Sequence, residues 1–128
     1  MKVSGFTFIR NAVKFDFPVV ESISSVLPLC DHFVVAVGKS DDGTKDLIQG
    51  IGSDKISMIE TEWDETLEKG GEVYAAETDK AFDAIPPEFD WCFYIQGDEV
   101  LHEKFIPAVE KAMHENLHRK EIDGLQIG

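Results

Sequence analysis

Short continuous apolar runs recur along the chain and are separated by stretches in which apolar residues stand three or four positions apart. Continuous apolar runs are typical of strands buried on both faces of a parallel sheet. They predict strands over residues 3–9, 33–37, 55–59, 91–95 and 124–128. The spaced stretches between them predict helices.

The helix boundaries follow from proline and from apolar spacing. Asp16 followed by Pro18 indicates a helix start, because proline is tolerated in a first turn, and Pro28 ends this helix. Three further helices are predicted, beginning at Thr44, spanning residues 71–85, and beginning at about Phe105.

Strands that alternate with helices in this order predict an α/β fold. The sheet should be mostly parallel, with right-handed crossovers and helices on both faces, which gives three layers. The 128 residues suffice for one domain spanning 1–128. Because the predicted strand over 124–128 has no successor, we expect a fold that is incomplete at its C-terminal end. We also expect the bare strand edge to favour a homodimer.

The charge of the chain excludes one class of partner. Twenty-five acidic and twelve basic residues give a net charge of −13, which repels polyanions, so no nucleic acid is expected to bind. A phosphorylated small molecule would need a bound cation or a few well-placed bases. No apolar stretch is long enough to span a membrane, and residues 1–5 do not resemble a secretion signal. We therefore expect a cytoplasmic protein.

Polar clusters follow the predicted strands where each strand ends. The clusters are Arg10-Asn11, Ser40-Asp41-Asp42, Trp63-Asp64 and Gln96-Gly97-Asp98-Glu99. Since ligands bind outside the carboxyl ends of parallel strands, we expect these clusters to share one edge of the sheet. Mg²⁺ and Mn²⁺ commonly bind one or two protein carboxylates together with phosphate oxygens. Asp98 and Glu99 are therefore the predicted cation site; the alternative is that Asp98 caps a turn and Glu99 points to water.

Several other candidates have ordinary structural explanations. Cys30 and Cys92 lack the spacing of a zinc or redox motif, and their apolar neighbours predict two buried thiols. Trp63 either stacks on a nucleobase or packs in the core, and core packing is favoured. His102 and Glu103 either join the acidic site or begin the next helix.

Four segments together resemble the family 2 glycosyltransferases, and the resemblance covers nearly the whole chain. The segments are Phe8-Ile9-Arg10-Asn11, Pro18-Val19-Val20-Glu21-Ser22, Ser40-Asp41-Asp42-Gly43-Thr44 and Phe93-Tyr94-Ile95-Gln96-Gly97-Asp98-Glu99. The resemblance implies the Rossmann-like GT-A fold. It also implies metal-dependent, inverting transfer of a sugar from a nucleotide-diphosphate sugar to an acceptor hydroxyl, such as that of a glycan.

The resemblance also assigns site residues. Asp98 would be the final acid of the metal-binding D-x-D-type motif for Mn²⁺ or Mg²⁺, with Glu99 beside it. Gln96 stands where the motif usually has its first acid. Asp41 or Asp42 would lie near the nucleoside. With Asn11 and Gln96 they make up the expected contacts to the nucleotide sugar.

The catalytic base is implied to lie in the second half of the domain, so no catalytic residue is assigned. We therefore expect residues 1–128 to recognise a donor without efficient glycosylation. Two alternatives remain open: a non-catalytic nucleotide-sugar-binding or assembly module of the same fold, and a nucleotidyltransferase or phosphohydrolase that uses the same acidic edge. Product analysis separates the three.

Overall fold

Four strands and the helices between them make up the part of the chain that the computed structural model describes, residues 1–63 and 70–119. The strands are β1 (Val3–Ile9), β2 (His32–Gly38), β3 (Ile56–Thr61) and β4 (Trp91–Tyr94). The helices are α1 (Val19–Val26), α2 (Thr44–Gln49), α3 (Gly70–Asp83) and α4 (Ile106–Asn116), with short 3₁₀ turns η1 (Leu27–Leu29) and η2 (Glu103–Phe105). The predicted order of elements is confirmed, while the strand predicted over 124–128 lies outside the described residues.

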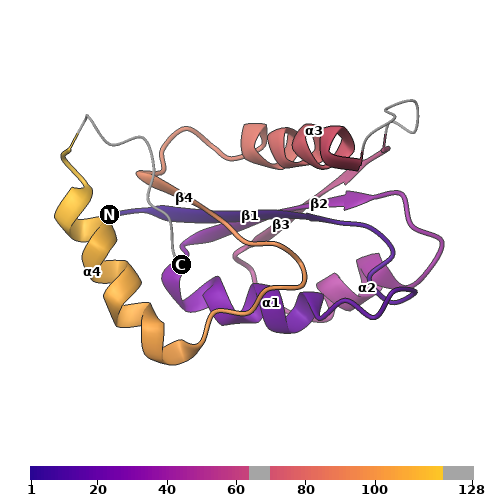
Figure 1. Ribbon diagram of the computed structural model, residues 1–128, viewed down its shortest axis with the longest axis horizontal. Helices are drawn as coiled ribbons and strands as arrows, with labels where there is room; N and C mark the ends of the chain where they lie inside the picture. The colour runs from indigo at the N-terminus through magenta and orange to yellow at the C-terminus, as the bar shows by residue number, and fades with distance from the viewer. Residues whose placement is uncertain (64–69, 120–128) are drawn as a thin grey trace.

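The four strands form one sheet in the order β3-β2-β1-β4, and every neighbouring pair is parallel. Helix α3 covers one face, and α1, α2 and α4 lie on the other (Figure 1). This three-layer arrangement confirms the predicted α/β class. All carboxyl ends of the strands consequently lie at the same edge of the sheet.

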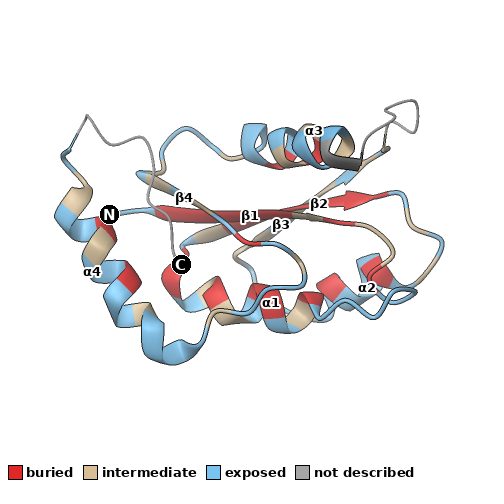
Figure 2. Cartoon of the chain, viewed as in Figure 1, coloured by how far each residue is buried: buried red, intermediate tan, exposed pale blue. Residues whose placement is uncertain are grey.

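The core is built around β1 and β2, the two central strands, which are almost continuously buried (Figure 2). Ile23 and Val26 of α1 are fully buried against this layer, as is Phe33 of β2. Burying an aliphatic or aromatic side chain of this size stabilises the fold by roughly 1.5–3 kcal/mol. The central strands therefore form a stable base for the loops at their carboxyl ends.

Strand β4 differs from the prediction of a strand buried on both faces. It lies at the edge of the described sheet and alternates between half-buried and exposed residues. The prediction of two buried thiols is consequently wrong for Cys92, which is exposed. Cys30 is buried as predicted, and this burial raises the pKa of its thiol to about 12. An apolar run indicates a strand but does not distinguish a central position from an edge.

The start of α1 also differs in detail. Pro18 occupies the position before the first helical residue, and no side chain caps the helix. Asp16 adopts a φ of 56° in the preceding loop, so it belongs to a turn and does not begin the helix. That left-handed conformation is one that aspartate tolerates better than most residues.

Candidate functional site

The predicted polar clusters lie at the carboxyl edge of the sheet. Arg10 and Asn11 directly follow β1, Ser40 to Asp42 follow β2, and Gln96 to Glu99 follow β4. Trp63 lies two residues beyond β3, whereas its neighbour Asp64 lies outside the described residues. The fold thus places the clusters along one rim, where loops of an α/β sheet commonly bind ligands.

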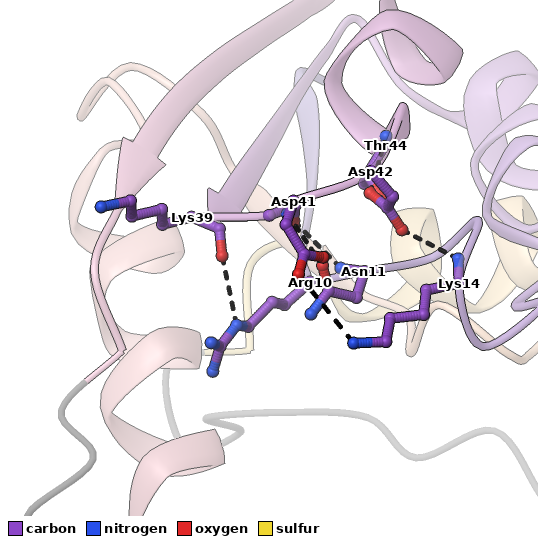
Figure 3. A network of polar contacts seen from close by, with 8 residues as sticks. Arg10, Asn11, Lys14, Lys39, Asp41, Asp42 and Thr44 are labelled. Atoms are coloured by element: carbon purple, nitrogen blue, oxygen red, sulfur yellow. Dashed lines mark hydrogen bonds and ion pairs between the residues drawn. The ribbon is translucent and has the colours of Figure 1, made fainter.

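Hydrogen bonds join the loop after β1 to the loop after β2 (Figure 3). The backbone N–H of Asn11 donates to Oγ of Ser40 at 3.0 Å, and the backbone N–H of Asp41 donates to Oδ1 of Asn11 at 3.2 Å. Asn11 adopts a φ of 54°, a left-handed conformation that asparagine tolerates. These contacts fix the Asn11 amide beside the Asp41 carboxylate, whose side chain is 74% exposed.

The Asp42 carboxylate forms hydrogen bonds with neighbouring residues of the two loops. It accepts backbone N–H groups of Lys14 at 2.8 Å and Thr44 at 3.0 Å, as well as the Thr44 hydroxyl. Burial favours the neutral carboxyl, but the Thr44 hydroxyl and these N–H groups outweigh it and hold the pKa of Asp42 below its usual value. The buried Thr44 oxygen also accepts the N–H of Ala12 at 2.8 Å. Asp42 therefore organises the rim, while Asp41 presents its carboxylate to solvent.

Two adjoining hollows open along this rim. The smaller, of about 190 Å³, is lined by Arg10, Asn11, Lys39, Ser40 and Asp41. The larger, of about 380 Å³, is lined by Val37, Gly38, Lys39, Ser40, Asp42, Lys45, Glu60, Thr61 and Glu62. Lys39 and Ser40 line both, so the hollows adjoin each other across the ends of the three strands β1, β2 and β3, and they are together called the crevice. Small-molecule sites typically enclose a few hundred cubic ångströms.

The crevice is lined by basic side chains (Arg10, Lys39 and Lys45) as well as acidic ones (Asp41, Asp42, Glu60 and Glu62). Arg10 donates from Nε to the Lys39 carbonyl at 3.2 Å, and Lys14 Nζ lies 3.9 Å from Asp41. Lys45 pairs with Glu60, and this contact raises the pKa of Lys45 and lowers that of Glu60. Sequence reasoning singled out Arg10 but missed the lysines. The sequence feature that could have identified these lysines is their position within a few residues of the predicted acidic cluster.

The acidic turn after β4 has a different construction. The Glu99 N–H donates to the Gln96 carbonyl at 3.0 Å, and the Gln96 N–H donates to a Glu99 carboxylate oxygen at 3.0 Å. From α1, the Ser22 hydroxyl donates to the Gln96 carbonyl at 2.9 Å. Gly97 lies so close to β1 that a Cβ there would be 2.7 Å from Cδ1 of Ile9. The turn is thus seated on α1 and β1.

The donor set of this turn suits a divalent cation that also binds a ligand. Asp98 and Glu99 are exposed neighbours, and one Glu99 oxygen already accepts an N–H group. Within residues 1–63 and 70–119, no group of three or more His, Cys, Asp or Glu side chains could hold a metal ion. Two carboxylates match the small share of protein ligands that Mg²⁺ takes when phosphate oxygens and waters complete its shell.

The weaker candidates take their ordinary structural roles. Nδ1 of His102 accepts the Lys104 N–H at 3.1 Å at the start of η2, so His102 begins the next helix. Trp63 is half-buried and packs against the rings of Phe8 and Tyr74 at centroid distances of 6.0 and 5.8 Å. Trp63 therefore packs on neighbouring rings at the sheet edge, between the half-buried Phe8 and the exposed Tyr74, and is not part of the buried core.

Neither a known protein family nor a curated protein matches this sequence. The fold is similar to that of S. aureus TarS 1–349, with a TM-score of 0.64 and 16% identity. It is also similar to TarS 1–349 in complex with UDP (TM-score 0.63, 15% identity) and with UDP-GlcNAc (TM-score 0.60, 17% identity). The match covers 100% of this chain and 38% of TarS 1–349, or 37% in the UDP-GlcNAc complex.

Identity this low supports a conclusion about the fold alone. No helix among the described residues is long and apolar enough to cross a membrane. The all-parallel sheet, the helices on both of its faces and the likeness to TarS agree with one another. Residues 1–63 and 70–119 therefore have an α/β, Rossmann-like fold of the GT-A type.

Proposed function

We propose that this chain is the nucleotide-sugar-binding part of a family 2-like glycosyltransferase, which transfers a sugar with inversion to an acceptor hydroxyl. One observation carries the proposal. The network of Asn11, Ser40 and Asp41 lies at the same sheet edge as the Asp98–Glu99 turn, in a fold similar to structures that contain UDP and UDP-GlcNAc. The crevice along this edge supplies the space for a ligand.

The loop network supports recognition of the nucleoside. Because Oδ1 of Asn11 accepts the Asp41 N–H, Nδ2 is the part of the amide that can donate to a ligand. The exposed Asp41 carboxylate beside it accepts hydrogen bonds. A donor next to an acceptor suits a nucleobase edge that presents both, and a preformed pair loses little entropy on binding.

The acidic turn is proposed to act at the diphosphate. Asp98 and Glu99 hold Mn²⁺ or Mg²⁺, and the exposed Gln96 amide lies beside them to contact the ligand. A divalent cation bound there supplies Lewis-acid stabilisation of the leaving diphosphate, on the order of several kcal/mol. Arg10 and Lys39 add positive charge at the smaller hollow, which they line together with the single acid Asp41.

The acceptor hydroxyl must lose a proton during transfer, and a positioned general base typically contributes ~10²–10⁴-fold to the rate. We assign no described residue to this role. The proposal for residues 1–128 is accordingly donor recognition, with slow donor hydrolysis as the largest chemical activity.

The test combines binding with product analysis. Nucleotide-diphosphate sugars of different bases are added with Mn²⁺, and thermal unfolding is recorded. A true donor at 100 times its Kd stabilises the protein by about 2.7 kcal/mol, which raises Tm by several degrees. Mass spectrometry with candidate acceptors should show no glycoside above background.

Other outcomes discriminate the rivals. Rapid release of phosphate or formation of a nucleotidyl product would favour the nucleotidyltransferase or phosphohydrolase alternative. Robust glycosylation by residues 1–128 would refute the restriction to donor recognition. Absence of a Tm increase with every nucleotide sugar would refute the proposed function.

A further inference from the structure

Helix α3 carries a carboxylate, Glu77, that is buried against the sheet. Its side chain is only 1% exposed. Glu77 stands four residues before the fully buried Ala81, and it therefore belongs to the face of α3 that packs on the sheet. A buried acid on such a face calls for a specific reason, since carboxylates are seldom buried unless paired.

Each carboxylate oxygen of Glu77 accepts a hydrogen bond, and both contacts connect Glu77 to the end of β3, one directly and one through Lys80. Oε1 accepts the hydroxyl of Thr61, the last residue of β3, and Oε2 accepts Nζ of Lys80 at 2.6 Å. The same Lys80 Nζ donates to the carbonyl oxygen of Glu62 at 3.1 Å. Glu77 and Lys80 together thus hold two consecutive residues at the carboxyl end of β3.

Burying a carboxylate between a helix and a sheet is energetically unfavourable compared with burying an apolar side chain there. Removing a carboxylate from water costs several kcal/mol, and well-packed apolar residues often replace such pairs without loss of stability. Helix packing alone would therefore be served by an apolar residue at position 77. The buried Glu77 carboxylate and the partly exposed Lys80 ammonium instead fix the backbone at Thr61 and Glu62, through the Thr61 hydroxyl and the Glu62 carbonyl.

That backbone forms a wall of the proposed donor site. Thr61 and Glu62 line the larger hollow, and Trp63 follows them directly. The Trp63 indole lies against Gly38, where a Cβ would be 2.4 Å from Nε1, and the Arg10 guanidinium lies 5.3 Å from the ring centroid. Arg10 in turn lines the smaller hollow.

We propose that Glu77 and Lys80 are a positioning pair for the donor site. By holding the end of β3, they keep Trp63 against Gly38 and keep Arg10 in place over the Trp63 ring. The inference rests on the proposed function, because it names residues that hold the walls of the nucleotide crevice. Neither residue lines either hollow itself.

The experiment uses residues 1–128 with Trp91→Phe, so that Trp63 is the remaining tryptophan. Glu77→Met removes both contacts, whereas Glu77→Gln keeps an oxygen that can accept the Thr61 hydroxyl. Val109→Ala in α4 serves as the control, because Val109 is a buried core residue outside the crevice. The readouts are the emission maximum of Trp63 without ligand, Tm, and Kd for UDP and the other nucleoside diphosphates with Mn²⁺.

Glu77→Met should shift Trp63 emission to longer wavelength and raise Kd by roughly tenfold, the effect of losing one or two hydrogen bonds from the wall. Glu77→Gln should raise Kd about threefold, a partial rescue by the conservative variant. Val109→Ala should lower Tm with emission and Kd unchanged.

The inference is overturned if either Glu77 variant keeps wild-type emission and affinity, or if Val109→Ala changes both as strongly. Glu77→Gln decides the matter if Glu77→Met does not fold. A wild-type protein that binds no nucleoside diphosphate would refute the proposed function instead. In that case the ligand-free Trp63 emission still tests the positioning pair on its own.

Discussion

The two loop regions proposed to bind the donor differ in how many of their polar groups form hydrogen bonds within the chain. After β1 and β2, Asn11, Asp42 and Thr44 bind backbone groups of the facing loop, so this region is ordered by its own hydrogen bonds. After β4, Asp98 and Glu99 are exposed on a short turn. The hydrogen bond that holds this turn to α1 is made by its first residue, Gln96, whose carbonyl accepts the Ser22 hydroxyl. Asp42 thus organises the facing loops, whereas Asp98 is presented to solvent and Glu99 accepts one N–H within its own turn.

This difference indicates the order in which the site is completed. In the proposed site, the preformed loops after β1 and β2 would select a nucleoside before any cation is bound. The acidic turn supplies too few ligands to bind a divalent ion tightly alone, so it needs the phosphate oxygens of the same ligand. The central claim is therefore that cation and nucleotide bind together at Asp98 and Glu99.

The largest difference in stability between the two regions is expected when one aspartate is removed from each. Asp42→Ala leaves the N–H groups of Lys14 and Thr44 without their acceptor, which should cost roughly 2–3 kcal/mol and lower Tm by about 10 °C. Asp98→Ala removes an exposed side chain and should change Tm by no more than about 1 °C. Thermal unfolding of both variants tests this, and equal losses of stability would contradict the distinction.

A pair of glycines tests how tightly each region is packed. A Cβ at position 97 would lie 2.7 Å from Cδ1 of Ile9, whereas a Cβ at position 43 would meet nothing within 4 Å. Gly97→Ala should therefore cost about 1–2 kcal/mol and weaken Mn²⁺-dependent nucleotide binding as the turn shifts. Gly43→Ala is the control and should leave both unchanged. Denaturant unfolding and calorimetry measure the two effects, and a neutral Gly97→Ala would show that the turn is not seated on β1.

The anchor between the acidic turn and α1 can be tested with two neighbouring serines. Leu101 donates its N–H to the Ser25 hydroxyl at 3.0 Å, so Ser25→Ala should cost about 1 kcal/mol. Ser24 is exposed on the same helix, and Ser24→Ala should be neutral. If chemical denaturation gives the same free energy of unfolding for both variants, this hydrogen bond does not hold the turn.

The smallest expected effect is the pH dependence contributed by Asp42. Its pKa is lowered in the folded protein from the usual 3.8, so its ionised form stabilises the fold above pH 3.8. That contribution is lost as pH falls below 3.8 and through the lower folded pKa. The difference in Tm between the wild type and Asp42→Asn should therefore shrink between about pH 6 and about pH 2. A constant difference would show that the Asp42 charge does not act in the network.

The sequence was sufficient to predict the order of strands and helices and the edge of the sheet where the polar clusters meet. This succeeded because apolar runs and helical spacing report burial directly, and parallel strands bring their carboxyl ends together. The edge position of β4 and the exposure of Cys92 could not be predicted, because they depend on which strands become neighbours.

Side-chain partners were the least predictable part of the site. Asp41 and Asp42 are adjacent and alike in sequence, yet only the fold shows that Asp42 meets the N–H groups of Lys14 and Thr44. Glu77 was missed because an acid within a charged helix is usually solvated. Its spacing of four residues from Ala81 was the available signal.

Calorimetry of nucleoside diphosphate binding with and without Mn²⁺ tests the central claim most directly. For the wild type, Mn²⁺ alone should bind weakly, and Mn²⁺ should strengthen binding of the preferred nucleoside diphosphate by at least about tenfold, or roughly 1.4 kcal/mol. Asp98→Ala should lose that gain and bind the nucleotide as the wild type does without Mn²⁺. Equal binding by the wild type and Asp98→Ala in the presence of Mn²⁺ would contradict the claim.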